Sequence, residues 1–158
     1  MVDTDDHAPD FTVPLADGDI EPFTLSENLG EGPVVLAFFP GAFTGTCTNE
    51  MQTFQDDLEA YESIGASVYG VSVDTPFSLN EFRDKHELDF GLLSDHQKQV
   101  IDAFDVGTDF TDIGYHDVAK RAVFVIDEEG TVTFKWVTDD ASVEPDYEAV
   151  REAAQAAA

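Results

Sequence analysis

The sequence predicts one α/β domain over residues 1–158, with helices covering both faces of a central mixed β-sheet. Residues 33–39 (PVVLAFF) form a continuous apolar, β-rich run that is typical of a buried central strand. Further strand-like runs alternate with segments of helical spacing, and a hairpin and a final helix follow. Hydrophobic residues make up 42% of the chain and include thirteen Phe, which is enough material to bury a core. We therefore expect a three-layer α/β/α architecture.

The elements follow from periodicity and from residues that begin or end helices. Apolar residues recur at three- and four-residue intervals from Met51 to Tyr61, and Gly65 lies where this helix should end. Residues 105–120 lack clear periodicity and are predicted to be a loop. In chain order we expect a small hairpin (10–15 and 21–25), a strand (33–39), a helix (46–64), a strand (66–73), a helix (from 74), a short strand (90–94), a helix (97–104), the loop, a hairpin (122–126 and 131–137) and a final helix (from 145).

The charge balance is strongly acidic, with 34 Asp and Glu against seven Lys and Arg and a formal net charge of -27. Such a surface repels nucleic acid and anionic membranes, because both bind through clustered basic residues. The acidic residues are scattered between apolar positions, so they do not form a disordered tail. Molar salt would screen their repulsion, since the Debye length falls to about 3 Å at 1 M. The composition favours a halophilic protein over an ordinary acidic one.

The cysteine count and the apolar runs indicate the compartment. One cysteine cannot form an intrachain disulfide, which is unlike a secreted disulfide scaffold. The acidic N-terminus lacks the basic and apolar regions of a signal peptide. The longest apolar run, 34–39, is too short to span a bilayer. We expect a cytoplasmic protein with neither a membrane nor a nucleic acid as partner.

The candidate site surrounds the single cysteine. Cys47 follows the buried strand and lies in the first turn of the next predicted helix, where unpaired N–H groups and the helix dipole favour an anion. This position promotes the reactive thiolate, and the same N–H groups could hold an oxygen of a small molecule. Thr44 places a hydroxyl within reach of the sulfur or of a ligand oxygen, and Pro40 rigidifies the turn.

A lone cysteine also has a simpler interpretation. Free cysteine is usually a small, inert and buried hydrophobic residue. The neighbours of Cys47 are polar (TGTCTNE), unlike a core segment, and the position lies between a strand and a helix. Both features favour reactivity over inertness.

These residues resemble a known family. Residues 40–47 (PGAFTGTC) match the peroxiredoxin pattern of Pro, three residues, Thr, two residues and Cys. The chain is similar to peroxiredoxins up to about Trp136, and most similar to their one-cysteine, alkyl-hydroperoxide-reductase-E-like and bacterioferritin-comigratory-protein-like branch. Further segments match in the family's order: 8–11 (APDF), 23–26 (FTLS), 71–74 (VSVD) and 121–130 (RAVFVIDEEG).

The resemblance implies a thioredoxin-like fold and the reduction of hydroperoxides to alcohols and water. Cys47 would be the nucleophile that attacks a peroxide oxygen and becomes a sulfenic acid. Pro40 would shield the sulfenate, and Thr44 would orient the peroxide by hydrogen bonding. Arg121 would hold the thiolate charge and stabilise the polarised O–O bond.

Arg121 also stands out without the resemblance. It is one of three arginines in a highly acidic chain and begins an apolar strand, where its charge is costly unless it meets a negative partner. A surface arginine that pairs with a nearby carboxylate is the alternative.

Two other residues near the cysteine have open roles. Glu50, one helical turn beyond Cys47, could hold Arg121 in place or could be an ordinary first-turn acid that suits the helix dipole. Phe43 and Phe39 could form an apolar collar around the peroxide, although core packing is favoured for Phe39.

No cofactor or metal is expected. The four histidines show no paired ligand spacing, and one cysteine cannot build a structural zinc site. The chain also lacks phosphate-loop, dinucleotide and calcium-loop patterns.

Three functions remain in competition: a peroxidase, a peroxide-sensing thiol switch that passes its signal to a partner, and an inert thioredoxin-like assembly domain. The Thr44, Cys47 and Arg121 set argues against the third. Because no resolving cysteine is present, an external small thiol or redoxin must recycle the enzyme. The resemblance also implies that a homodimer could form.

Overall fold

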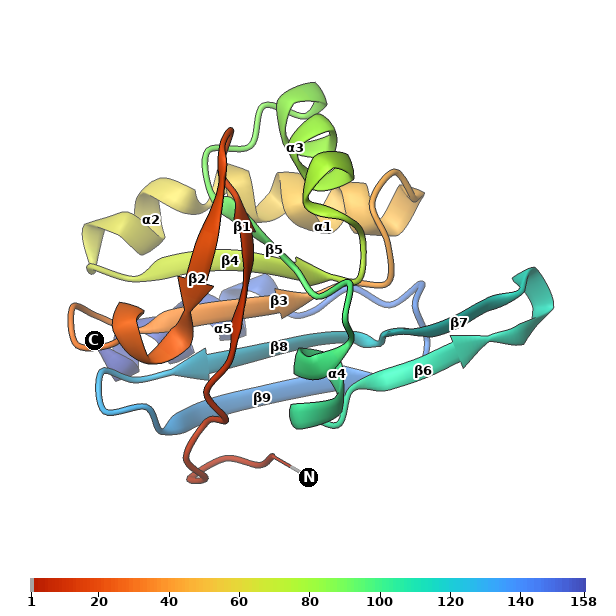
Figure 1. Cartoon of the computed structure of the whole chain (residues 1–158). Helices are drawn as coiled ribbons and strands as arrows, with labels where there is room; N and C mark the ends of the chain where they lie inside the picture. The colour runs from red at the N-terminus through yellow and green to blue at the C-terminus, as the bar shows by residue number, and fades with distance from the viewer. Residues whose placement is uncertain (1) are drawn as a thin grey trace.

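The computed structural model describes residues 2–158 and is built on a seven-stranded mixed sheet with helices on both faces (Figure 1). The three central strands β3, β4 and β5 run parallel, whereas β8 pairs antiparallel with β3. The predicted α/β fold is confirmed. In sheet order the strands are β2 (Ile20–Thr24), β1 (Thr12–Ala16), β5 (Gly91–Ser94), β4 (Ser67–Ser72), β3 (Val34–Phe38), β8 (Arg121–Ile126) and β9 (Val132–Thr138).

Every residue of β3 is buried, as the apolar run predicted. Side chains alternate between the two faces of a strand, so this strand contributes to two separate cores. Val34, Leu36 and Phe38 join the core on one face, and Val35 and Ala37 join the core on the other.

Helices of unequal extent cover the two faces. α1 (Gly45–Asp56), α2 (Leu58–Ser63), α3 (Pro76–Lys85) and α5 (Tyr147–Ala157) pack on one face, and α4 (Gln99–Ala103) and the short 3₁₀ helix η1 (Leu25–Asn28) pack on the other. The single helix predicted over 46–64 is divided at Asp57, whose carboxylate accepts a 2.7 Å bond from Arg151 of α5. No helix among residues 2–158 is both long and apolar enough to cross a membrane.

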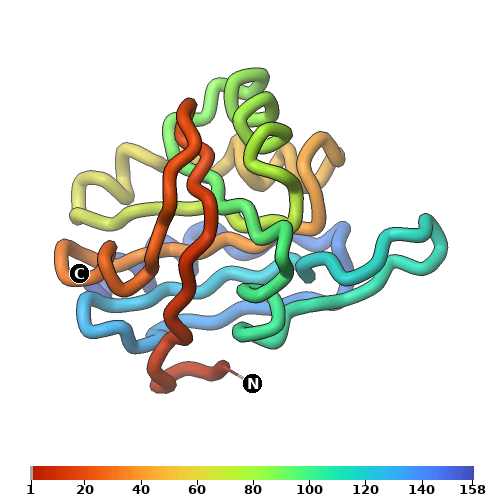
Figure 2. Tube along the Cα trace, viewed as in Figure 1, coloured from red at the N-terminus to blue at the C-terminus, as the bar shows by residue number. Residues whose placement is uncertain are grey.

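The predicted loop over 105–120 is wrong, because this segment is a second, two-stranded sheet. β6 (Gly107–Phe110) pairs with β7 (Tyr115–Ala119), and a short 3₁₀ helix, η2 (Thr111–Ile113), connects them. The strands pair only with each other, so most of the hairpin is exposed and it lacks the apolar alternation of a half-buried strand. The hairpin extends away from the main sheet at the start of β8 (Figure 2).

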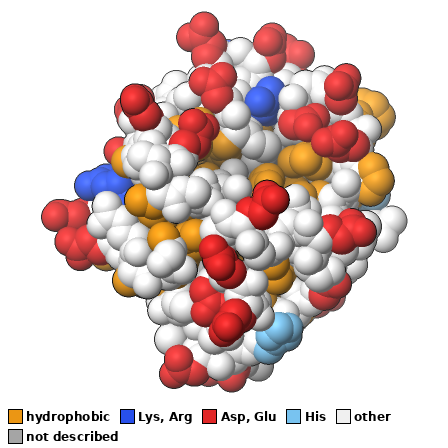
Figure 3. Space-filling view, turned by 90° about the vertical axis from the view of Figure 1, so that its left-hand side faces the viewer, with side chains coloured by type: hydrophobic (Ala, Val, Ile, Leu, Met, Phe, Trp, Pro, Cys, Tyr) orange, Lys and Arg blue, Asp and Glu red, His pale blue; other side chains and the backbone are white. Residues whose placement is uncertain are grey.

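Acidic side chains cover much of the surface. Figure 3 shows many separate Asp and Glu side chains on one face and few Lys or Arg among them. Because these charges are dispersed over several elements, their mutual repulsion acts on the whole folded state.

Candidate active site

Cys47 is the third residue of α1 and is almost completely buried, with 1% of its surface exposed. Strand β3 ends at Phe38, and the connecting segment 39–44 leads directly into this helix. A cavity of about 530 Å³ reaches the cysteine from outside, and its inner wall includes Pro40, Thr44 and Arg121. A small molecule can therefore reach the sulfur although solvent scarcely touches it.

Arg121 lies at the start of β8, the strand paired with β3, and its side chain is 1% exposed. Its Nη2 donates to the Sγ of Cys47 at 3.3 Å, and its Nη1 donates to Oε1 of Glu50 at 2.9 Å. Its Nε and Nη2 also donate to the carbonyl of Ala141 at 3.1 and 2.7 Å. A buried cation is costly unless it is paired and hydrogen-bonded, and this geometry meets both conditions.

Glu50 is fully buried and lies beyond the first turn of α1, which contains no acidic residue, so the alternative of an ordinary first-turn acid is wrong. Burial raises the pKa of this carboxyl to about 8, although the charge and hydrogen bond of Arg121 oppose the shift. Its second oxygen, Oε2, has no hydrogen-bond partner among the described residues. The carboxyl accepts from the guanidinium and holds it in position.

The segment before the helix is tied to its surroundings at two points and within itself at a third. The amide of Ala42 donates to Oδ2 of Asp74 at 2.8 Å, and the hydroxyl of Tyr115 donates to the carbonyl of Pro40 at 2.9 Å. The hydroxyl of Thr44 donates to the carbonyl of Gly41 at 2.9 Å. Thr44 thus lines the cavity, but its hydroxyl is bonded within its own turn and not to the sulfur.

The first turn of α1 leaves backbone donors beside the cavity. Thr44 occupies the N-cap position without a side-chain capping bond, and Gly45 and Thr46 line the cavity with Cys47. The first N–H groups of a helix have no partner within the helix. They can hold an anionic or peroxidic oxygen next to the sulfur.

The two aromatic candidates near the cysteine pack against α3. Phe43 has a positive φ of 68°, is 51% exposed, and packs edge-on against Phe82 of α3 with ring centroids 5.3 Å apart. Phe39 is fully buried and stacks on the same ring at 6.2 Å. Neither residue lines the cavity. Phe39 has the core role that was favoured for it, and a contact of Phe43 with the peroxide stays a prediction.

Three site contributors escaped the sequence analysis. Tyr115 lies in the segment predicted as a loop, and burial, together with the charges of Asp74 and Cys47, raises the pKa of its hydroxyl. Asp74 was given no role at the site, although it lies in the matched segment 71–74 and at a predicted helix start. Ala141 acts through its backbone carbonyl, and because every residue has one, the residue type gives no indication of this role. The described residues contain no group of three or more His, Cys, Asp or Glu side chains arranged to hold a metal ion.

Comparison with known proteins identifies the class. The AhpC/TSA family model matches residues 4–135, so this chain belongs to the AhpC/TSA family. Its relatives within the family are peroxiredoxins of the Bcp kind. The chain is 36% identical over 128 residues to a putative peroxiredoxin of Mycobacterium tuberculosis and 34% identical over 128 residues to peroxiredoxin Bcp of Escherichia coli. Each alignment covers 80% of both chains.

Solved structures support the same assignment. The chain superposes on peroxidoxin BcpB of Mycobacterium tuberculosis with a TM-score of 0.86 and 31% identity, covering 99% of this chain and 98% of that one. It superposes on the bacterioferritin comigratory protein of Xanthomonas campestris with a TM-score of 0.80 and 28% identity, covering 92% and 90% of the two chains. The latter structure was described in connection with alkyl peroxide reduction.

Proposed function

We propose that this protein is a thiol-dependent peroxidase that reduces hydrogen peroxide and organic hydroperoxides through a sulfenic acid on Cys47. One observation carries the proposal: Nη2 of a buried arginine lies 3.3 Å from a buried sulfur, and both residues line an open cavity. A fixed positive charge at a cysteine favours the thiolate, which is the nucleophilic form. The peroxidases among its relatives support the same chemistry.

In the first step the thiolate of Cys47 attacks the terminal oxygen of ROOH. A new S–O bond forms as the O–O bond breaks, so the sulfur is oxidised to Cys–SOH and the peroxide is reduced. The leaving RO⁻ takes a proton and departs as ROH, or as water when the substrate is hydrogen peroxide. The sulfenic acid is the first, reversible stage of thiol oxidation.

The surrounding groups stabilise charge as it moves from sulfur to oxygen. The guanidinium of Arg121 is fixed by Glu50 and by the carbonyl of Ala141, so it does not need to reorganise during the reaction. The N–H groups of the first helical turn offer further donors to the peroxide oxygens. Pro40 contributes no N–H donor of its own and lines the cavity beside the sulfur.

An external thiol completes the cycle. A first R′SH condenses with Cys–SOH to give a mixed disulfide and water, and a second R′SH releases the thiol of Cys47 and R′SSR′. Because the chain has only one cysteine, both sulfur atoms of the oxidised reductant come from outside it.

Steady-state consumption of hydrogen peroxide with excess dithiothreitol tests the proposal. The wild-type protein should turn over many equivalents, and Cys47→Ser should be folded and inactive, because a serine hydroxyl does not ionise near neutral pH. Circular dichroism of both proteins controls for folding. Activity in the serine variant would disprove the role of Cys47. Oxidation of the wild type without turnover would instead favour a sensor.

A further inference from the structure

The cavity that reaches Cys47 is much larger than the reacting atoms require. It encloses about 530 Å³, whereas one water molecule occupies about 30 Å³ of the liquid. A peroxide group adds only one oxygen to that size. Cavities of about 300–1,000 Å³ are typical of sites for small organic molecules. The space beyond the sulfur is therefore large enough for the organic part of a hydroperoxide.

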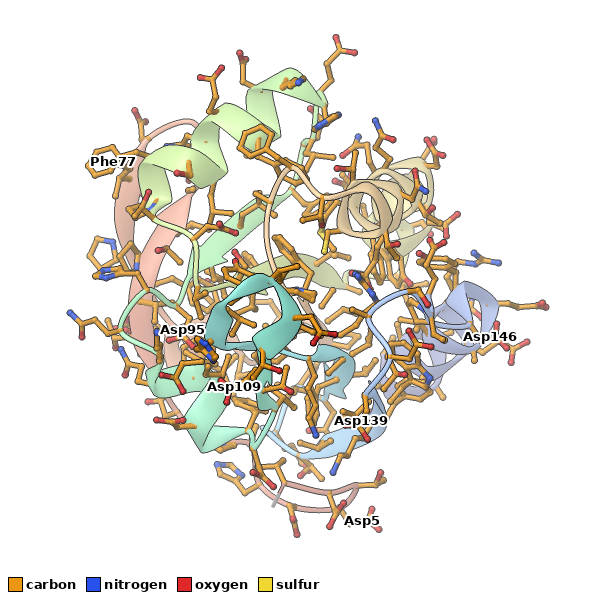
Figure 4. The ribbon with its side chains drawn as sticks, turned by 90° about the vertical axis from the view of Figure 1, so that its right-hand side faces the viewer. Asp5, Phe77, Asp95, Asp109, Asp139 and Asp146 are labelled. Atoms are coloured by element: carbon orange, nitrogen blue, oxygen red, sulfur yellow. The ribbon has the colours of Figure 1, made fainter. Side chains whose placement is uncertain are left out.

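The β6–β7 hairpin supplies an apolar surface to this space. Ile113 of η2, at the tip of the hairpin, is 77% exposed and lines the cavity together with the half-buried Phe110. Ala141 and Ser142 line it from the segment after β9. Figure 4 shows both parts on the same side of the molecule, with Asp109 on the hairpin and Asp139 on the segment after β9. An apolar group lying between them would remove apolar surface from water.

The charges around the cavity oppose an anionic ligand. Asp109 and Asp112 line it, and among residues 2–158 Arg121 is the only basic side chain that does. The guanidinium donors are bonded to Cys47, Glu50 and the carbonyl of Ala141. A carboxylate on the tail of a substrate would thus meet two acidic side chains and, apart from Arg121 at the sulfur, no basic side chain of the cavity wall.

We propose that the β6–β7 hairpin is the binding site for the organic tail of an uncharged hydroperoxide. Ile113 and Phe110 contact the tail, and Asp109 and Asp112 select against tails that carry a carboxylate. This proposal rests on the peroxidase function above and adds to it the class of organic substrate and the element that selects it.

The apolar part is tested by single-turnover oxidation of Cys47 by cumene hydroperoxide and by hydrogen peroxide. In Ile113→Ser the ratio of the two rate constants, cumene hydroperoxide over hydrogen peroxide, should fall about tenfold, the scale of a lost apolar contact in a binding site. Phe77→Ser is the matched control, because Phe77 of α3 is 74% exposed and lies outside the cavity. The control should keep the wild-type ratio.

The electrostatic part is tested with linoleic acid hydroperoxide and its methyl ester, which differ only in the carboxylate. At the lowest salt concentration at which the protein is folded, the wild type should react faster with the ester. Asp112→Lys should raise the acid-to-ester ratio at least about threefold, the scale of a solvent-exposed charge interaction. Glu128→Lys, an equal change of charge in the turn at the other end of β8, should leave the ratio as it is.

The outcomes separate this proposal from the function on which it rests. If the wild type reduces no hydroperoxide, both are wrong. If it reduces hydrogen peroxide while Ile113→Ser keeps the wild-type ratio, the peroxidase stands and the hairpin site is overturned. Equal effects of Asp112→Lys and Glu128→Lys would show that net charge, and not the cavity wall, sets the preference.

Discussion

Replacing the buried carboxyl of Glu50 by an amide should make the protein more stable, and increasingly so as the pH rises. In the folded state burial raises the pKa of Glu50 from its ordinary 4.5 to about 8. Between these values the unfolded chain has released a proton that the folded protein retains, so the wild type loses stability as pH rises through this window. Below it the carboxyl is protonated in both states and contributes nothing.

The size of the effect follows from the same two values. A difference between 4.5 and about 8, at about 1.36 kcal/mol per pH unit, sets an upper limit of about 5 kcal/mol above pH 8. Glu50→Gln abolishes this titration and keeps an oxygen that can accept from Arg121. Its stability relative to wild type should therefore increase by a few kcal/mol from about pH 5 to about pH 9, and peroxide oxidation near neutral pH should change only a few-fold.

The measurement is urea unfolding across this pH range at constant salt, followed by the fluorescence of the only tryptophan, Trp136. Glu128→Gln is the control, since Glu128 is exposed and its amide should not change the pH dependence relative to wild type. If the stability difference between Glu50→Gln and wild type is the same at every pH, the carboxyl is ionised in the folded protein and the argument fails.

Four further outcomes are expected. Arg121→Ala should slow oxidation of Cys47 by about 10² or more in stopped-flow experiments, as expected when a preorganised charge stabiliser is lost, and a rate within a few-fold of wild type would remove Arg121 from the mechanism. Tyr115→Phe loses the bond to Pro40 and should lower the unfolding free energy by about 1 kcal/mol; unchanged urea unfolding would show that this bond adds nothing. The melting temperature should rise with potassium chloride into the molar range, because screening relieves repulsion among the acidic side chains; a flat profile would count against a halophilic design. One equivalent of peroxide should add one oxygen to the intact mass without forming a disulfide-linked dimer, and excess peroxide should give sulfinic and sulfonic forms; rapid, quantitative dimerisation would disprove the external-thiol cycle.

Most of the fold could be predicted because its core strands are continuous apolar runs. The strand 33–39 and the hairpin around Gly130 correspond to β3, β8 and β9 within a residue or two at each end. The hairpin at 107–119 could not be found in this way. Its stability comes from pairing between two mostly exposed strands, and such strands carry no periodic apolar signal.

In the candidate site, too, some residues could be predicted from the sequence and others could not. Side chains with unusual chemistry for their position, Cys47 at a helix start and Arg121 at the start of an apolar strand, were identified from the sequence. The structure brings them within hydrogen-bonding distance. Contacts made by backbone carbonyls, such as that of Ala141, could not be predicted, because they do not depend on the type of side chain. The packing of Phe43 could not be predicted either, because its left-handed backbone conformation and its contact with α3 depend on tertiary structure.

The burial of Cys47 within the first turn of α1 would impose different routes on small reactants and on a protein reductant. Peroxides and small thiols are narrow enough to reach the sulfur through the cavity of the folded protein. A disulfide with another protein requires the two Cα atoms to approach within about 4.4–6.8 Å. A redoxin backbone can approach that closely only after the first turn of α1 has opened locally, at a free-energy cost that small thiols avoid. Conditions that stabilise this helix should therefore slow reduction by a protein partner while leaving reduction by small thiols unaffected.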